Sequence, residues 1–173
     1  PASWMSMFIY LVMAFWAAIG LAFNTRLSGM MAQALAPTGA LMAFLSLWTG
    51  ALWGKPMWGT WWVWDARLTS ELILFFLYLG FMALQAAIED RRRAARAGAV
   101  LALVGVVNIP IIHYSVEWWN TLHQGATVSK LSNPSMTWDM LWPLLTMALG
   151  FMAYFAAAVL VRSRCEILQR ERH

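Results

Sequence analysis

The stretch TSELILFFLYLGFMALQAAIE, residues 69–89, decides the fold class, because its interior from Leu72 to Ile88 carries no charged side chain. A helix needs about 20 mainly apolar residues to cross the hydrocarbon core of a bilayer. Similar stretches occur at residues 4–23, 29–53, 98–115 and 137–161. Lipid offers no partners for backbone polar groups, so such stretches are expected to be helical. The sequence therefore predicts an all-α, polytopic membrane helix bundle with five transmembrane helices.

Composition supports a membrane protein with one domain. Hydrophobic residues make up 61% of the 173 positions and charged residues 12%, whereas about 25% of a soluble domain is charged. The connections are short, so residues 1–173 are interpreted as a single transmembrane domain. The only cysteine, Cys165, excludes an internal disulfide. The formal charge is +4, but the basic residues lie at predicted membrane boundaries, which argues against nucleic-acid binding.

Basic residues are distributed unevenly among the connections and predict the orientation. Arginines follow the first, third and fifth apolar stretches, at Arg26, Arg91, Arg92, Arg93, Arg96, Arg162, Arg164, Arg170 and Arg172. The alternate connections carry only Lys55, Arg67 and Lys130. The positive-inside rule therefore predicts a cytoplasmic C-terminus and places the alternate connections outside.

Tryptophan shows the opposite asymmetry. Most of the 12 tryptophans lie in or beside the two outer connections, at Trp53, Trp58, Trp61, Trp62, Trp64, Trp118, Trp119 and Trp138. Indoles commonly anchor helices at the headgroup level, and this remains the simplest alternative interpretation. An aromatic belt would decorate both interfaces, however, whereas the inner connections contain no tryptophan. The distribution favours a specialised outer surface.

The densest aromatic run is GKPMWGTWWVWDAR, residues 54–67, which is expected to open the third helix. A helical backbone would bring four side chains to one face, those of Trp58, Trp61, Trp62 and Asp65. An extended backbone would instead point three side chains in the same direction, those of Trp58, Trp62 and Trp64. Either arrangement gives a broad aromatic surface bordered by Asp65 and Arg67. Haem suits such a surface, because its macrocycle stacks on indoles and its propionates pair with a guanidinium.

Two histidines are candidates for the outer surface. His123 lies in the second outer connection, and a neutral imidazole there can donate a lone pair to haem iron. The competing interpretation is a histidine that is simply hydrogen-bonded at the surface. His113, near the outer end of the fourth stretch, is the second candidate. Glu71 and Glu117 are outer carboxylates that could support the site, and no zinc site is expected from two histidines without a cysteine pair.

The residues around these candidates resemble a known group of proteins. The run Trp58-Gly59-Thr60-Trp61-Trp62-Val63-Trp64-Asp65 resembles the tryptophan-rich motif of the haem-handling membrane proteins of cytochrome c biogenesis. The extension ARLTSEL at 66–72 and the segment WWNTLHQG at 118–125 are similar to one family in this group, cytochrome c maturation protein C, also known as haem exporter protein C. The resemblance covers essentially the whole chain.

This resemblance implies a bacterial inner-membrane protein of six helices that holds haem b at the periplasmic surface. His123 would be an axial ligand of the iron, and the motif residues in contact with haem would be Trp58, Trp61, Trp62, Trp64 and Asp65, with Arg67 beside them. Trp53, Trp118 and Trp119 flank these positions and are further candidate contacts. Haem would pass to a haem chaperone, cytochrome c maturation protein E. The chain would work beside an ABC transporter built from maturation proteins A and B, together with the small maturation protein D.

The resemblance also predicts a histidine outside this chain. In the family, the other axial histidine comes just before a Val-Pro step, and this chain begins Pro1-Ala2-Ser3-Trp4. That histidine and a sixth helix are therefore expected immediately upstream of Pro1.

Two other functions stay open from the residues alone. A haem-containing membrane oxidoreductase would bury haem between helices, with histidines at membrane depth, where only His113 comes near. A transporter of another flat hydrophobic substrate would need broken helices near the midplane, for which Pro110 and Pro143 offer weak support. No Ser/His/Asp arrangement or nucleotide motif is present, so no catalytic residue is predicted.

Overall fold

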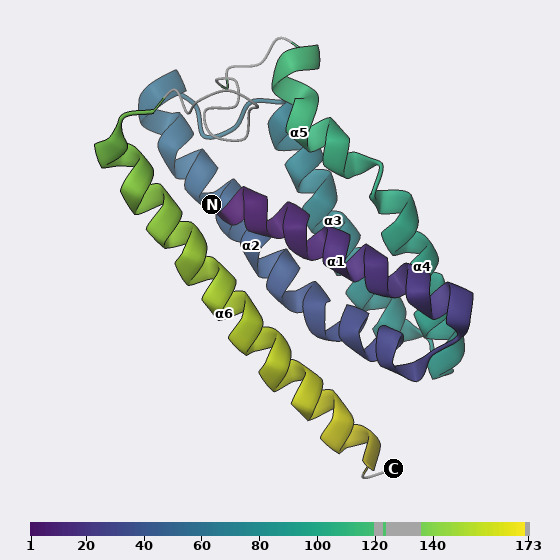
Figure 1. Cartoon of the computed structure of the whole chain (residues 1–173). Helices are drawn as coiled ribbons and strands as arrows, with labels where there is room; N and C mark the ends of the chain where they lie inside the picture. The colour runs from purple at the N-terminus through teal and green to yellow at the C-terminus, as the bar shows by residue number, and fades with distance from the viewer. Residues whose placement is uncertain (120–122, 124–135, 172–173) are drawn as a thin grey trace.

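The computed structural model describes residues 1–119, 123 and 136–171. These residues form α1 (Ala2–Phe23), α2 (Arg26–Trp58), α3 (Ala66–Ala87), α4 (Arg91–Gly105), α5 (Asn108–Trp118) and α6 (Trp138–Glu171) (Figure 1). In this part of the chain five segments are long and apolar enough to cross a membrane, with α4 and α5 forming one of them. The prediction of an all-α, multi-pass membrane helix bundle is confirmed.

The span predicted at residues 98–115 is interrupted between α4 and α5. The cause is Pro110, which has no N–H to offer to the carbonyl of Val106 and whose ring would clash with it. Around the break, the N–H of Val106 bonds to the carbonyl of Leu103 at 3.2 Å. Asn108 is buried and donates from Nδ2 to the carbonyl of Ser70 at 2.8 Å, so its side chain joins α5 to α3.

The core forms where α1 packs on α2 and α4, and where α3 packs on α2, α4 and α5. Tyr78 of α3 lies at its centre and donates a hydrogen bond from its hydroxyl to the carbonyl of Ser6 at 2.7 Å. Gly39 of α2 faces the Tyr78 ring so closely that a Cβ would have no space. A small residue at this position therefore lets α2 and α3 approach, as is common between membrane helices.

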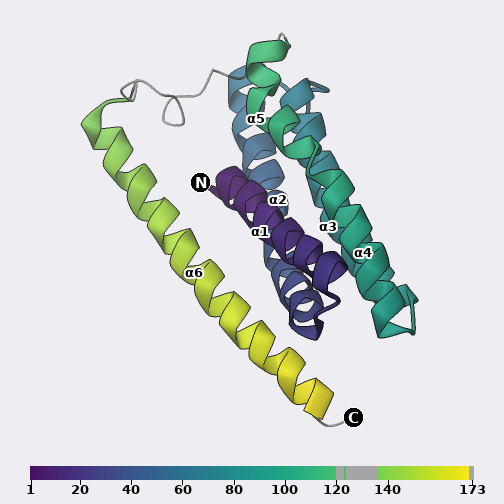
Figure 2. The same ribbon diagram turned by 45° about the vertical axis from the view of Figure 1, so that its right-hand side comes forward.

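Helix α6 lies at the edge of the bundle and contacts mainly α2 (Figure 2). Most of its large apolar side chains are exposed, including Trp142, Leu149 and Leu160. Exposed apolar side chains are expected of a helix that faces lipid, because lipid is as apolar as leucine.

The connections gather at two opposite ends of the bundle, which differ in composition (Figures 1 and 2). One end carries residues 53–65, Trp118, Trp119 and Trp138, and is called the tryptophan end. The other end carries the α1–α2 connection, residues 89–96 and the last turns of α6, and is called the arginine end. The fold therefore separates the tryptophans of the outer connections from most of the arginines by the length of the bundle.

Candidate functional site

The aromatic run does not form a single regular element. Helix α2 continues to Trp58, beyond the end predicted at residue 53, and stops where Gly59 adopts a φ of 77°. This left-handed conformation strains residues that carry a Cβ and suits glycine. Residues 60–65 then form an irregular link, so the third helix is opened only by the end of the run, where Asp65 caps α3 and Ala66 is its first residue. Only Trp58 of the motif is helical, because the glycine ends α2 inside the motif.

Asp65 joins the start of α3 to the second connection of the tryptophan end. Its Oδ1 accepts a hydrogen bond from the N–H of Leu68 at 2.8 Å and caps α3. Its Oδ2 lies 2.7 Å from Nδ1 of His123. The Asp65 side chain is 5% exposed and that of His123 is 20% exposed. One carboxylate therefore fixes both a helix terminus and an imidazole that lies 58 positions further along the chain.

The His123 ring also contacts the indoles. Its centroid lies 4.9 Å from that of Trp58 in an edge-to-face arrangement, and Trp58 lies 5.3 Å from Trp53 in the same manner. Trp62 and Trp64 form another edge-to-face pair at 5.5 Å. Edge-to-face aromatic pairs are favourable and orient both rings. The structure thus brings together the imidazole, the carboxylate and part of the indole run.

The contact with Asp65 orients the imidazole and sets its tautomer. With Asp65 ionised, the pair is a hydrogen bond in which Nδ1–H of His123 donates to Oδ2, so Nε2 of the neutral ring carries the lone pair. Histidines that bind metals commonly make this second bond to a carboxylate, which orients the ring and raises its basicity. In the described part of the chain, no group of three His, Cys, Asp or Glu side chains could enclose a bare metal ion. A metal held by its own macrocycle, as in haem, needs only a single imidazole from this chain and fits these residues.

Several indoles present a large exposed apolar surface at the same end. Trp61 and Trp64 are 55% and 76% exposed, and the Lys55 ammonium lies 5.9 Å from the Trp61 ring centroid. Trp118 stacks on Tyr114 of α5 at 5.4 Å and contacts Trp119 edge-to-face at 5.9 Å. The cation beside Trp61 supplies a positive charge next to the indoles.

Four other candidates have different surroundings. Glu71 is buried and accepts hydrogen bonds from Ser6 at 2.8 Å and Ser3 at 2.9 Å, so its carboxylate ties α3 to α1. The His113 ring lies 4.8 Å from that of Tyr114 in α5. Arg67 is half-buried one helical turn before Glu71, and Glu117 is exposed. Residues 120–122 and 124–135, including Lys130, lie outside the described residues.

Two features of the site were not predicted from the sequence. The pairing of Asp65 with His123 joins distant parts of the chain. The only local signal was that a carboxylate that caps a helix with one oxygen has a second oxygen that can accept a hydrogen bond. The serines around Glu71 are spaced three residues apart in α1, and this spacing places Ser3 and Ser6 on one helical face. That pattern could have indicated a buried polar partner.

Comparison with known proteins identifies the family. The family model described as Heme exporter protein C matches residues 1–173. The heme exporter protein C of Haemophilus influenzae is 53% identical over 171 residues, which cover 99% of this chain and 70% of the relative. The protein of the same name from Escherichia coli K12 is 53% identical, with 99% and 69% covered, and that of Paracoccus denitrificans is 48% identical, with 98% and 71% covered. The chain therefore belongs to the heme exporter protein C family.

Proposed function

We propose that this chain holds haem at its tryptophan end and presents it for transfer during cytochrome c maturation. The observation that carries the proposal is the 2.7 Å contact between Asp65 Oδ2 and His123 Nδ1, beside the Trp58 ring. It orients an imidazole for iron among exposed indoles. The name that the relatives bear, heme exporter protein C, supports haem as the cargo.

In this proposal each group has a distinct task. Haem brings an iron with open axial positions, an apolar macrocycle and two carboxylates. His123 binds the iron through Nε2, and Asp65 holds the ring in the tautomer that leaves Nε2 unprotonated. The indoles contact the macrocycle, and Arg67 or Lys55 restrains a propionate. Because Trp61 and Trp64 are exposed, a partner could reach the cargo without entering the bundle.

The orientation and the partners are part of the same proposal. The concentration of arginines supports placing the arginine end in the cytoplasm, so that the tryptophan end faces the periplasm of a bacterial inner membrane. Residues 1–173 act there as one transmembrane domain. The receiver of haem is the chaperone, cytochrome c maturation protein E. The chain works beside the ABC transporter of maturation proteins A and B and beside the small maturation protein D.

Visible absorption spectroscopy tests the proposal. The purified chain loaded with haem is expected to show a Soret band, and His123→Ala is expected to shift the band and to weaken haem retention. His113→Ala is the matched control, because His113 packs on Tyr114 within α5. A parent chain without a Soret band would refute haem binding. A band that changes with His113→Ala instead of His123→Ala would move the ligand to α5.

A further inference from the structure

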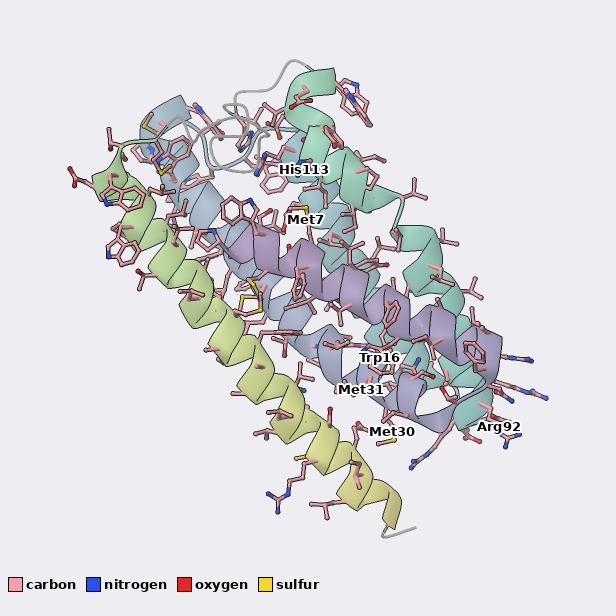
Figure 3. The ribbon with its side chains drawn as sticks, in the orientation of Figure 1. Met7, Trp16, Met30, Met31, Arg92 and His113 are labelled. Atoms are coloured by element: carbon pink, nitrogen blue, oxygen red, sulfur yellow. The ribbon has the colours of Figure 1, made fainter. Side chains whose placement is uncertain are left out.

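A cavity lies at the arginine end, away from the residues discussed above. It has a volume of about 420 Å³ and opens where the end of α1, the start of α2, the end of α3 and the start of α4 meet. Small residues from α1, α2 and α4 line this space: Gly20, Gly29, Ala32, Ala95 and Ala99. Figure 3 shows Trp16 and Arg92 toward this end of the bundle and His113 toward the other. The volume is within the range of small-molecule sites, about 300–1,000 Å³.

The lining of the cavity is divided between apolar and cationic groups. Trp16, Leu21 and Phe81 provide apolar surface from α1 and α3. Arg91, Arg92 and Arg96 line the cavity from α4, and all three are exposed, so their charges lie where it meets solvent. Among the described residues, no carboxylate belongs to the lining. The cavity therefore suits a molecule with an anionic head and an apolar portion.

In the part of the chain that the structure describes, no carboxylate lies within 4.0 Å of the guanidinium groups of these three arginines. Asp90 is the neighbouring acid, but its Oδ1 accepts from the backbone N–H groups of Arg92 at 2.8 Å and Arg93 at 3.0 Å. Its Oδ2 lies 4.0 Å from Arg93. Glu166 lines an adjacent cavity that Arg91 also borders. The cationic rim is thus available to an external anion.

The wall of the cavity is held in place by hydrogen bonds between helices. Gln33 of α2 donates from Nε2 to Oε1 of Gln85 at 2.6 Å, and Gln85 of α3 donates from Nε2 to the carbonyl of Ala94 at 3.0 Å. These bonds connect α2, α3 and α4 beside the arginines. A site whose wall is fixed before binding loses less conformational entropy when a ligand arrives.

We propose that this cavity binds the phosphate group of an anionic phospholipid. Arginine binds phosphate through two parallel hydrogen bonds, and basic pockets between membrane helices bind anionic lipid headgroups. Arg91 begins one candidate membrane span, and residues 24–26 separate two others, so in a bilayer the rim would lie at headgroup level. The apolar lining receives the first part of the lipid below its phosphate. This proposal does not depend on haem binding at the opposite end.

Lipid retention in nanodiscs provides the test. The chain is reconstituted in nanodiscs of equimolar phosphatidylglycerol and phosphatidylcholine. Native mass spectrometry then identifies the lipids that stay bound when the protein is released from the nanodisc. Any arginine near the membrane surface contributes roughly a fivefold preference for an anionic lipid, so losing two of them should reduce the preference roughly 30-fold through charge alone. Arg92→Gln with Arg96→Gln should reduce it further, because direct hydrogen bonds to the phosphate are lost as well. The matched control is Arg93→Gln with Arg164→Gln, which removes the same charge from residues outside the lining.

The control separates a specific site from general surface charge. Equal loss in both double variants would overturn the proposal, because it would show that net charge alone attracts the lipid. Ala95→Leu keeps every charge but fills the cavity, and it should also lower retention of phosphatidylglycerol. Adding millimolar inorganic phosphate to the chain in neutral lipid shows whether the cavity binds free phosphate or the phosphate group of a lipid. Protection of the wild type from thermal unfolding by phosphate alone, equal to that by phosphatidylglycerol, would refute the lipid as the ligand.

Discussion

Replacing Asp65 with asparagine tests the central contact of the site. The carboxylate uses one oxygen to cap α3 through Leu68 and the other to accept from Nδ1–H of His123. An asparagine side chain has one oxygen and one amide nitrogen. If its oxygen keeps the cap, its nitrogen faces His123 and donates to Nδ1, which moves the ring proton to Nε2. The lone pair that should bind iron is then lost.

The expected magnitudes separate this effect from unfolding. Loss of such a supporting contact to a metal-binding histidine lowers affinity about 10- to 100-fold, or about 1.4–2.8 kcal/mol. Asparagine caps helices about as well as aspartate, so Asp65→Asn should leave the stability of the bundle within about 0.5 kcal/mol of the wild type. Asp65→Ala removes the cap too and should cost about 1 kcal/mol of stability in addition.

Haem titration followed by the Soret band measures the affinity, and thermal unfolding monitored by circular dichroism measures the stability. The matched control is Asp90→Asn, since Asp90 caps α4 through the N–H groups of Arg92 and Arg93 at the opposite end. It should bind haem like the wild type. Unchanged haem affinity in Asp65→Asn would refute the reasoning, as would a parallel loss in Asp90→Asn.

Three further predictions, two of them with a control variant, concern the site and the core. Trp58→Leu removes the ring beside His123 and should weaken haem retention about fivefold, whereas Trp142→Leu, on exposed α6, should leave the same titration unchanged. Gly39→Ala inserts a methyl group against a buried aromatic ring and should destabilise the bundle by about 1–3 kcal/mol in thermal unfolding. Gly50→Ala meets open space and should stabilise α2 by about 0.5–1 kcal/mol, so a loss equal to that of Gly39→Ala would contradict the packing argument. Asn108→Ala removes a buried hydrogen bond between helices and should cost about 1 kcal/mol, and an unchanged melting temperature would show that this bond is dispensable.

The membrane spans could be predicted from the sequence because lipid imposes a simple requirement on length and composition. The apolar stretch at 69–89 corresponds to α3, Ala66–Ala87, with small differences at both ends. The end of α2 was less predictable, because the apolar stretch stops at residue 53 whereas the helix continues through Pro56 to Trp58. A proline is tolerated in α2 here, and the glycine conformation at residue 59 sets the end.

The candidate site was predictable as a set of residues but not as a geometry. Composition and spacing identified His123, Asp65 and the indoles, because unusual residues were concentrated at one predicted face. Their pairing brings His123 to the start of α3 from 58 positions further along the chain, and no local pattern encodes that contact. Glu71 shows the same limit, since its partners Ser3 and Ser6 come from a helix more than 60 positions away.

The break between α4 and α5 makes α5 a short helix that is separate from α4. Its first residue, Asn108, is pinned to the backbone of α3 at Ser70, while its last residue, Trp118, is exposed at the tryptophan end. With a rise of 1.5 Å per residue, α5 is about 15 Å long from pivot to tip. A turn of about 10° around the pinned residue would carry Trp118 sideways by roughly 3 Å and leave α4 in place. Any rotation at the break would therefore be amplified at Trp118, where the connection that carries His123 begins.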